Sequence, residues 1–373
     1  MDMNNLSLGF DEGIVFALRE LYEKYGFSHY RMSKFEEYDL YAKNKDFLIS
    51  DSVITFTDMD GRLLALKPDV TLSIVKNLND TAGFTQKLYY NENVYRVGKG
   101  NRSFKEIMQT GLEAFGDIDT YTLCEVITLA VQSLKAISDD CVLDISNLDI
   151  LSAVMEKIAL PESKKGEFMR LVGEKNTHEL AALLNESDIS EADASKVIKL
   201  VSTCGTADKV LPEIKALLSG FCDEEPIDTL SDVLSSLEGD SASRIRIDFS
   251  VVDNTKYYNG IVFKGFIKGV PTAVLSGGQY NRLMKRLGRN CGALGFAVYH
   301  DTLDRLYDEY DGFDVDALVI YGDNSPRDIS GALAKLRAEG FSVMAQKKLP
   351  QNIKYRRLYS IEGENLKELE NNA

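Results

Sequence analysis

The segment from 104 to 116 constrains the fold of this chain more than any other part of its sequence. Read as a β-strand, it directs alternate side chains to opposite faces of a sheet. One face then carries Met108, Thr110, Leu112 and Ala114, and the other carries Ile107, Gln109, Gly111 and Glu113. The first face is mostly apolar, which predicts packing against a core.

The polar face of this strand suggests a ligand site. Gln109 offers an amide and Glu113 a carboxylate, and Gly111 between them would leave open space above the sheet. The carboxylate accepts hydrogen bonds, and the amide both donates and accepts them. With open space between the two groups, this arrangement suits a small cationic or amine-bearing ligand. A solvated polar face with a β-bulge at Gly111 accounts for the same residues, so both interpretations stand at this point.

Composition and charge narrow the class of protein. The chain has 373 residues, 44% of them hydrophobic and 27% charged, which is enough for two or three globular domains. Its net charge of −15 argues against RNA or DNA as a partner, because binding a polyanion requires a basic surface. The charge favours small molecules or proteins as partners.

The cysteine, histidine and hydropathy patterns predict a cytoplasmic protein without a metal. Five cysteines and three histidines are scattered without metal-ligand spacing, so we expect neither a zinc site nor a disulfide framework. No apolar run approaches the roughly 20 residues that a membrane span needs. The N-terminus lacks the basic and apolar regions of a signal peptide.

Hydrophobic periodicity divides the chain into three parts. Strand and helix patterns mix over residues 1–147 and again over 244–311, which predicts one core built on an antiparallel sheet. Helical patterns fill residues 148–243 and predict an all-α insertion. Residues 312–373 predict a small α/β unit. The predicted fold class is therefore α+β, and the pattern is not that of a Rossmann fold.

Local signals predict individual elements. A helical stripe over 11–25 is followed by Gly26, a C-cap residue. Met59-Asp60-Gly61 predicts a hairpin turn, and Gly277-Gly278 predicts the end of a strand. In the last part of the chain we expect a β-α-β unit with strands at 317–321 and 341–345 around a helix at 327–339.

Five ordered motifs give this chain a resemblance to the catalytic core of histidyl-tRNA synthetases. The matching segments are Gly26–Glu36 for class II motif 1, Ala65–Thr71 for the leucine-arginine-proline-glutamate-x-threonine segment, Tyr95–Glu113 for motif 2, Tyr257–Phe263 for the histidine-specific segment, and Gly277–Asn281 with Gly295–Ala297 for the approach to motif 3. The resemblance covers nearly the whole chain and implies a class II synthetase-like core. It also makes the C-terminal part similar to a truncated anticodon-binding domain.

The resemblance implies that the residues that bind histidine are retained. They are Asp69, Thr71, Gln109, Glu113, Tyr258 and Tyr280. The first three would hold the α-amino group of the ligand. Glu113 and Tyr258 would contact the imidazole, and Tyr280 would close the pocket. The tyrosines would alternatively pack in the core with a satisfied hydroxyl group, and we expect this of Tyr257.

The positions that carry ATP chemistry in the family are altered here. Asp253 stands at the catalytic arginine, Thr302 at the motif 3 arginine and Gly98 at a motif 2 glutamate. Lys67 replaces another arginine, and Arg96 alone remains of the main ATP-binding residues. An aspartate repels the carboxylate and the phosphate that the arginine would neutralise. We therefore expect no catalytic residue and no adenylation.

A chain that keeps the histidine-binding residues but lacks most ATP-binding residues resembles a synthetase paralogue, the regulatory subunit of ATP phosphoribosyltransferase. The carboxylate after the proline is usually an aspartate in that paralogue, as Asp69 is here. The resemblance implies a non-catalytic chain without a cofactor, which binds free L-histidine for feedback control. It would activate a short-form catalytic subunit, within a hetero-oligomer, in the first step of histidine biosynthesis. A homodimer through motif 1 is also implied, although Ser33 replaces a proline there, and no tRNA is expected. The alternatives are an active histidyl-tRNA synthetase or another synthetase-like ligase that uses ATP.

Overall fold

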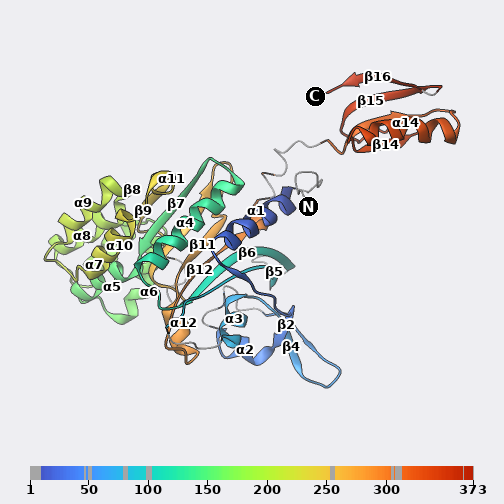
Figure 1. Ribbon diagram of the computed structural model, residues 1–373. Coiled ribbons are helices and arrows are strands. Elements are labelled where there is room, and N and C mark those ends of the chain that lie inside the picture. Colours follow the sequence, from blue (N-terminus) through green and yellow to red (C-terminus); the bar gives the residue numbers. More distant parts are fainter. Residues whose placement is uncertain are drawn as a thin grey trace. The chain divides into compact units, whose positions relative to one another are not determined.

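The computed structural model divides into two compact units, residues 1–306 and 307–373. It describes residues 10–45, 48, 53–78, 83–97, 103–252, 257–303, 306, 313–363 and 365–372. The first unit holds a nine-stranded sheet and a three-stranded sheet, and the second holds a four-stranded sheet (Figure 1). The further division of the first unit at 148 and 243 stays a prediction.

A mainly antiparallel sheet forms the centre of the first unit. The strand order is β1-β5-β6-β12-β11-β10-β7-β9-β8, with parallel pairs at β1–β5 and β7–β9. The strands are β1 (Ser28–His29), β5 (Gln86–Val97), β6 (Phe104–Gly116), β7 (Cys141–Asn147), β8 (Cys204–Thr206), β9 (Ile245–Asp248), β10 (Asn259–Ile267), β11 (Leu275–Gln279) and β12 (Gly292–Tyr299). This sheet confirms the predicted α+β fold with an antiparallel core.

β5 and β6 pair along their whole length and confirm the strand expected at 104–116. Their register is uninterrupted, so Gly111 lies in regular strand without a β-bulge. Gln109 and Glu113 are each 3% exposed, which makes the solvated-face interpretation wrong. The open space expected above Gly111 was also wrong. Tyr90 lies directly opposite on β5, and a Cβ at Gly111 would collide with its hydroxyl group.

Two helices, α1 (Phe10–Lys24) and α4 (Thr120–Ile137), pack against each other and against strands of this sheet (Figure 1). α1 ends before Gly26, whose φ of +79° is the left-handed conformation of a glycine C-cap. The Asp119 side chain accepts from the Thr122 backbone N–H at 2.8 Å and caps α4. Such a cap typically contributes about 1 kcal/mol.

The packing of α4 assigns the two faces of the sheet. The Leu134 side chain of α4 lies so close to Gly265 on β10 that a Cβ there would overlap its methyl groups. Adjacent residues of a strand point to opposite faces. Lys264 therefore lies on the face that α4 does not cover, and this is the face that carries the candidate site.

The uncovered face is partly closed by α3 (Thr71–Asn77), α12 (Asn281–Arg286) and a three-stranded sheet. That sheet has the order β2-β4-β3, with β2 (Phe35–Glu37), β3 (Thr55–Thr57), β4 (Leu63–Leu66) and the short helix α2 (Tyr38–Ala42) after β2. The Asp58 backbone N–H donates to the Arg62 carbonyl at 3.0 Å, and Gly61 has a φ of +80°, which confirms the predicted hairpin. Buried side chains join α3 and α12 to β5 and β6 in one core cluster.

One glycine prediction failed within the large sheet. β11 runs through Gly277 and Gly278, which pair with Phe296 and Gly295 of β12. A Cβ at Gly277 would overlap the Phe263 ring and the Phe296 side chain. The two glycines therefore allow close packing inside the strand and do not end it.

The segment from 148 to 243 is helical, as predicted, with one exception. Its helices are α5 (Leu148–Lys157), α6 (Glu162–Gly173), α7 (Thr177–Asn185), α8 (Glu191–Ser202), α9 (Ala207–Leu218), α10 (Glu225–Ser235) and α11 (Gly239–Ser243). The expectation of helix throughout is wrong at β8, which adds an edge strand to the large sheet by pairing with β9. Two of its three residues are exposed, so it has little of the hydrophobic pattern of a strand.

The second unit contains more β-strands than the sequence predicted. Its sheet has the order β14-β13-β15-β16, covered on one face by a helix. The elements are β13 (Val315–Ile320), α14 (Pro326–Ala338), β14 (Val343–Gln346), β15 (Tyr355–Glu362) and β16 (Asn365–Asn371). The predicted β-α-β unit is confirmed, but the prediction missed the final hairpin. That hairpin turns at Gly363, whose φ is +66°.

Candidate functional site

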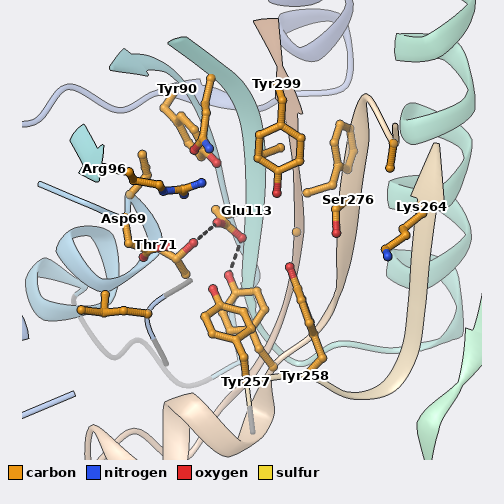
Figure 2. Close-up of a pocket in the computed structure, with 18 residues that line it drawn as sticks. Asp69, Thr71, Tyr90, Arg96, Glu113, Tyr257, Tyr258, Lys264, Ser276 and Tyr299 are labelled. Atoms are coloured by element: carbon orange, nitrogen blue, oxygen red, sulfur yellow. Dashed lines mark hydrogen bonds between the residues drawn. The ribbon is translucent and has the colours of Figure 1, made fainter. Parts of the chain in front are cut away.

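A pocket of about 540 Å³ opens on the uncovered face of the large sheet. Its lining comes from the five strands β5, β6, β12, β11 and β10, from the start of α3 and from the segment before β10 (Figure 2). The pocket brings together all six residues that the resemblance assigned to histidine, namely Asp69, Thr71, Gln109, Glu113, Tyr258 and Tyr280. Arg96 lines it as well. Gly98 and Asp253 lie outside the described residues.

The Glu113 carboxylate occupies the centre of the pocket. The Thr71 hydroxyl donates to Oε1 at 2.7 Å, and the Tyr280 hydroxyl donates to Oε2 (Figure 2). Burial raises the pKa of Glu113 to about 8, although both hydroxyl donors lower it, and the nearby Asp69 charge raises it slightly further. Burial therefore favours the protonated form of this carboxyl group. A cationic ligand would favour its ionised form.

Gly295 makes this position of Glu113 possible. It lies directly opposite Glu113 on β12. A Cβ at Gly295 would overlap Glu113 Oε2 and the Leu112 carbonyl oxygen. The glycine in the approach to motif 3 therefore has a steric reason in this chain, because it leaves room for the carboxylate.

Asp69 and Arg96 lie together at one end of the pocket (Figure 2). Asp69 Oδ1 accepts from the Leu72 backbone N–H at 2.9 Å, at the start of α3. Burial raises the pKa of Asp69, while this hydrogen bond and the positive charge of Arg96 lower it. Arg96 Nε donates to the Pro68 carbonyl at 3.0 Å, which holds the guanidinium beside the same loop. The Arg96 charge therefore lies near enough to Asp69 to lower the pKa of this carboxyl group.

Gln109 presents an unsatisfied donor to the pocket. Its Nε2 atom is buried and has no hydrogen-bond partner among the residues that the structure describes. Leaving a buried donor unpaired costs about 1–3 kcal/mol. A ligand that brings an acceptor to this amide would recover that energy.

Aromatic side chains close the other side of the pocket. The Tyr257 ring lies 4.6 Å from that of Tyr258 and 5.4 Å from that of Tyr280, measured between centroids. Tyr257 and Tyr280 are buried, and Tyr258 is partly exposed. Tyr257 was expected to pack in the core. It belongs to a core cluster and also lines the pocket, so the prediction was incomplete.

Four polar side chains of the pocket were not predicted from the sequence, namely Tyr90, Lys264, Ser276 and Tyr299. Lys264 carried a usable signal, because it is the one charged residue of the mostly apolar strand β10. Figure 2 shows Lys264 and Ser276 at the opposite end of the pocket from Arg96.

Two of the altered ATP positions lie elsewhere. Thr302 is not among the pocket residues, and its hydroxyl donates to the Tyr299 carbonyl at 2.7 Å in the 3-10 turn His300–Thr302. Lys67 is fully buried, and its ammonium pairs with Glu92 at 2.5 Å. Neither side chain offers a cation to a ligand in the pocket.

The described part of the chain contains neither a metal cluster nor a membrane span. No group of three or more histidine, cysteine, aspartate or glutamate side chains there is arranged to hold a metal ion. Within the same residues, no helix combines the length and the apolar character needed to cross a membrane.

Known proteins resemble this chain over most of its length. The ATP phosphoribosyltransferase regulatory subunit of Oceanobacillus iheyensis is 26% identical over 340 residues, which are 89% of this chain and 84% of the relative. A solved ATP phosphoribosyltransferase regulatory subunit/histidyl-tRNA synthetase from Bacillus halodurans superimposes with a TM-score of 0.73 at 24% identity, covering 90% of this chain and 88% of that one. A chain of the ATP phosphoribosyl transferase complex from Thermotoga maritima has a TM-score of 0.60 at 18% identity, with 79% and 98% covered.

These likenesses fix the fold and the family. The two solved structures confirm the class II synthetase-like fold that the motifs implied. The sequence model of the family described as histidyl-tRNA synthetase matches residues 9–303, which is well over half of the chain. The chain belongs to the histidyl-tRNA synthetase family.

Proposed function

We propose that this chain is the regulatory subunit of an ATP phosphoribosyltransferase and has no catalytic activity of its own. The O. iheyensis relative carries that name, and the T. maritima structure is a complex of the enzyme. The observation that carries the proposal is the contrast within one pocket. The Thr71 and Tyr280 hydroxyl groups converge on Glu113, as an amino-acid site requires, while Arg96 is the one cation of the family's ATP-binding set that lines the pocket.

The proposed ligand is free L-histidine. Its imidazole N–H would donate to Glu113, and Tyr258 would contact the other ring nitrogen. Tyr280 would close the pocket and keep its hydrogen bond to the Glu113 carboxylate. Its α-amino group would lie among Asp69, Thr71 and the amide oxygen of Gln109. Hydrogen bonds to an ionised partner are about twice as strong as neutral ones. Binding would therefore lower the pKa of Glu113 from its value of about 8.

Adenylation of the ligand is proposed to be absent. Attack of a carboxylate on the α-phosphate of ATP brings two negative groups together and needs cations directed at both. Thr302 is uncharged and the Lys67 ammonium is paired with Glu92. In the sequence, Asp253 adds a further negative charge where the family has an arginine. Arg96 by itself would have to serve both the carboxylate and the phosphate.

The remaining parts of the proposal concern assembly. The chain would act in the cytoplasm, bind a short-form catalytic subunit and form a homodimer, and it would not bind tRNA. The division into a core of residues 1–147 and 244–311, an insertion of residues 148–243 and a C-terminal part of residues 312–373 belongs to the same proposal. The last part would be a reduced anticodon-binding domain.

Co-purification with the short-form catalytic subunit of the same organism tests this function. We expect a stable complex that forms phosphoribosyl-ATP faster than the catalytic subunit alone and that histidine inhibits. The matched control is the full-length histidyl-tRNA synthetase of the organism, which should neither bind nor activate that subunit. Absence of a complex, together with histidine-dependent ATP–pyrophosphate exchange by this chain, would identify it as a synthetase and refute the proposal.

A further inference from the structure

We propose that the Tyr90 hydroxyl group recognises the α-carboxylate of the bound amino acid. This inference rests on the proposed histidine site and adds a specificity residue to it. A zwitterionic ligand brings a carboxylate into a pocket that already holds Asp69 and Glu113. The ligand's carboxylate therefore needs hydrogen-bond donors that the chain does not already use for itself.

Most donors of the pocket already have partners. The Thr71 and Tyr280 hydroxyl groups both donate to Glu113. Four further polar side chains of the lining have interactions within the chain, namely Tyr257, Tyr258, Lys264 and Tyr299. Two donors in the part of the pocket along β5 and β6 lack a hydrogen-bond partner among the described residues. They are the buried Gln109 amide nitrogen and the hydroxyl group of Tyr90, which is 2% exposed.

The Tyr90 hydroxyl group lies between the two side chains that would hold the ends of the ligand. Tyr90 on β5 pairs directly with Gly111 on β6, and a Cβ at Gly111 would lie 2.5 Å from the hydroxyl oxygen. Gln109 and Glu113 lie on the same face of β6, each two residues from Gly111, or about 7 Å along the strand. The hydroxyl group thus covers the floor of the pocket midway between them.

A single amino acid fits this spacing with its two α-groups side by side. With the ammonium at Asp69 and the Gln109 amide oxygen, and the imidazole at Glu113, the α-carbon lies over Gly111. The carboxylate is on that same carbon, so its oxygens lie roughly 3 Å from the ammonium nitrogen. Only donors next to the ammonium site can reach it. The Gln109 amide nitrogen and the Tyr90 hydroxyl group meet this requirement.

The electrostatic surroundings keep Tyr90 a donor. Burial raises the pKa of Tyr90 well above 10, and the nearby charges of Glu113 and Asp69 raise it further. The hydroxyl group therefore keeps its proton at neutral pH. Figure 2 shows Tyr90 on the same side of the pocket as Arg96. The Arg96 charge would favour a carboxylate there, although its Nε atom already donates to the Pro68 carbonyl.

Calorimetry with L-histidine and histamine tests the assignment. Histamine keeps the amine and the imidazole and has a hydrogen atom where L-histidine has its carboxylate. Tyr90→Phe keeps the ring and removes the hydroxyl group. It should weaken histidine binding about 10- to 150-fold, the range for a hydrogen bond to a charged group. Histamine affinity should stay unchanged, so the preference for histidine over histamine should fall by the same factor.

The matched control is Tyr89→Phe. Tyr89 is the next residue of β5 toward its start, is fully buried, and donates its hydroxyl group to Glu23 at 2.6 Å. Because adjacent residues of a strand point to opposite faces, this variant should change neither affinity. Without ligand, Tyr90→Phe should be at least as stable as the unmodified protein, since it breaks no hydrogen bond among the described residues.

Two results would overturn the assignment and leave the histidine site in place. One is an unchanged histidine affinity in Tyr90→Phe. The other is an equal loss of affinity for histidine and histamine, because the hydroxyl group would then contact the amine or the imidazole. Failure of the unmodified protein to bind histidine would refute the proposed site itself, and the assignment with it.

Discussion

Replacing Glu113 with glutamine should make the stability of the protein, measured without added histidine, less dependent on pH. The pKa of Glu113 rises from about 4.5 to about 8 on folding, chiefly through burial. Below pH 4.5 the carboxyl group is protonated in both states, and the folded state loses nothing. Above pH 4.5 the unfolded chain releases the proton while the folded chain keeps it, so folding becomes less favourable as pH rises toward 8.

The expected magnitude follows from these two pKa values. Between pH 5.5 and 7.5 the wild-type protein should lose about 2–3 kcal/mol of stability that the Glu113→Gln variant does not lose. Hydrogen exchange of the slowest amides in β6 measures this difference within the first unit. Comparing the two proteins at each pH cancels the intrinsic pH dependence of exchange. Glu156→Gln, on the exposed side of α5, is the matched control and should follow the wild type.

Saturating histidine should reduce the same pH dependence, because an imidazole N–H beside the carboxylate favours its ionised form. A stability difference between wild type and Glu113→Gln that stays constant from pH 5.5 to 7.5 without added histidine would show that Glu113 is ionised in the folded protein. The reasoning from burial would then be refuted.

Three further outcomes are expected. Purified protein should show no histidine-dependent ATP–pyrophosphate exchange above background. Asp253→Arg should not restore exchange, because catalytic groups that act as a unit are not additive. Exchange by either protein would contradict the proposal. Gly295→Ala should abolish histidine binding, because its methyl group would displace the Glu113 carboxylate. The control is Gly331→Ala, because Gly331 lies inside α14 with open space around it. This control should leave binding unchanged and stabilise the protein by about 0.5–1 kcal/mol. Tyr258→Phe should weaken histidine binding by less than about tenfold in calorimetry, since it removes one neutral hydrogen bond of about 1 kcal/mol; unchanged affinity would place Tyr258 outside the ligand's reach.

The central sheet and the pocket residues on β6 could be predicted because their signals are local. Alternation along 104–116 placed Gln109 and Glu113 on one face. The structure keeps them there and buries both. Family motifs added Asp69, Thr71, Tyr258 and Tyr280, which no periodicity connects to β6.

The features that the sequence did not predict depend on packing between distant segments. Lys264 reaches the pocket because β10 pairs with β11, and Tyr90 fills the space above Gly111 because β5 pairs with β6 in one particular register. The register of either strand pair cannot be predicted from one segment of the sequence alone. Gly277 resembles a strand terminator until the Phe263 ring that packs against it is known.

The unpredicted hairpin of the second unit has a local cause. β15 and β16 carry charged residues at many positions, so their apolar alternation is weak. Tyr359 and Ile361 of β15 nevertheless pack against α14 in the core of this unit. A strand that contributes two core residues is difficult to recognise when its exposed face and its partner strand are strongly charged.

Histidine inhibition of the reconstituted complex tests the central claim most directly. The complex of the catalytic subunit with the Glu113→Gln chain is compared with the wild-type complex over a range of histidine concentrations. Losing one charge-assisted hydrogen bond costs about 1.5–3 kcal/mol, so the inhibitory concentration should rise about 10- to 150-fold while assembly and uninhibited activity stay unchanged. Inhibition of both complexes at the same histidine concentration would contradict the account and place the effector site on the catalytic subunit.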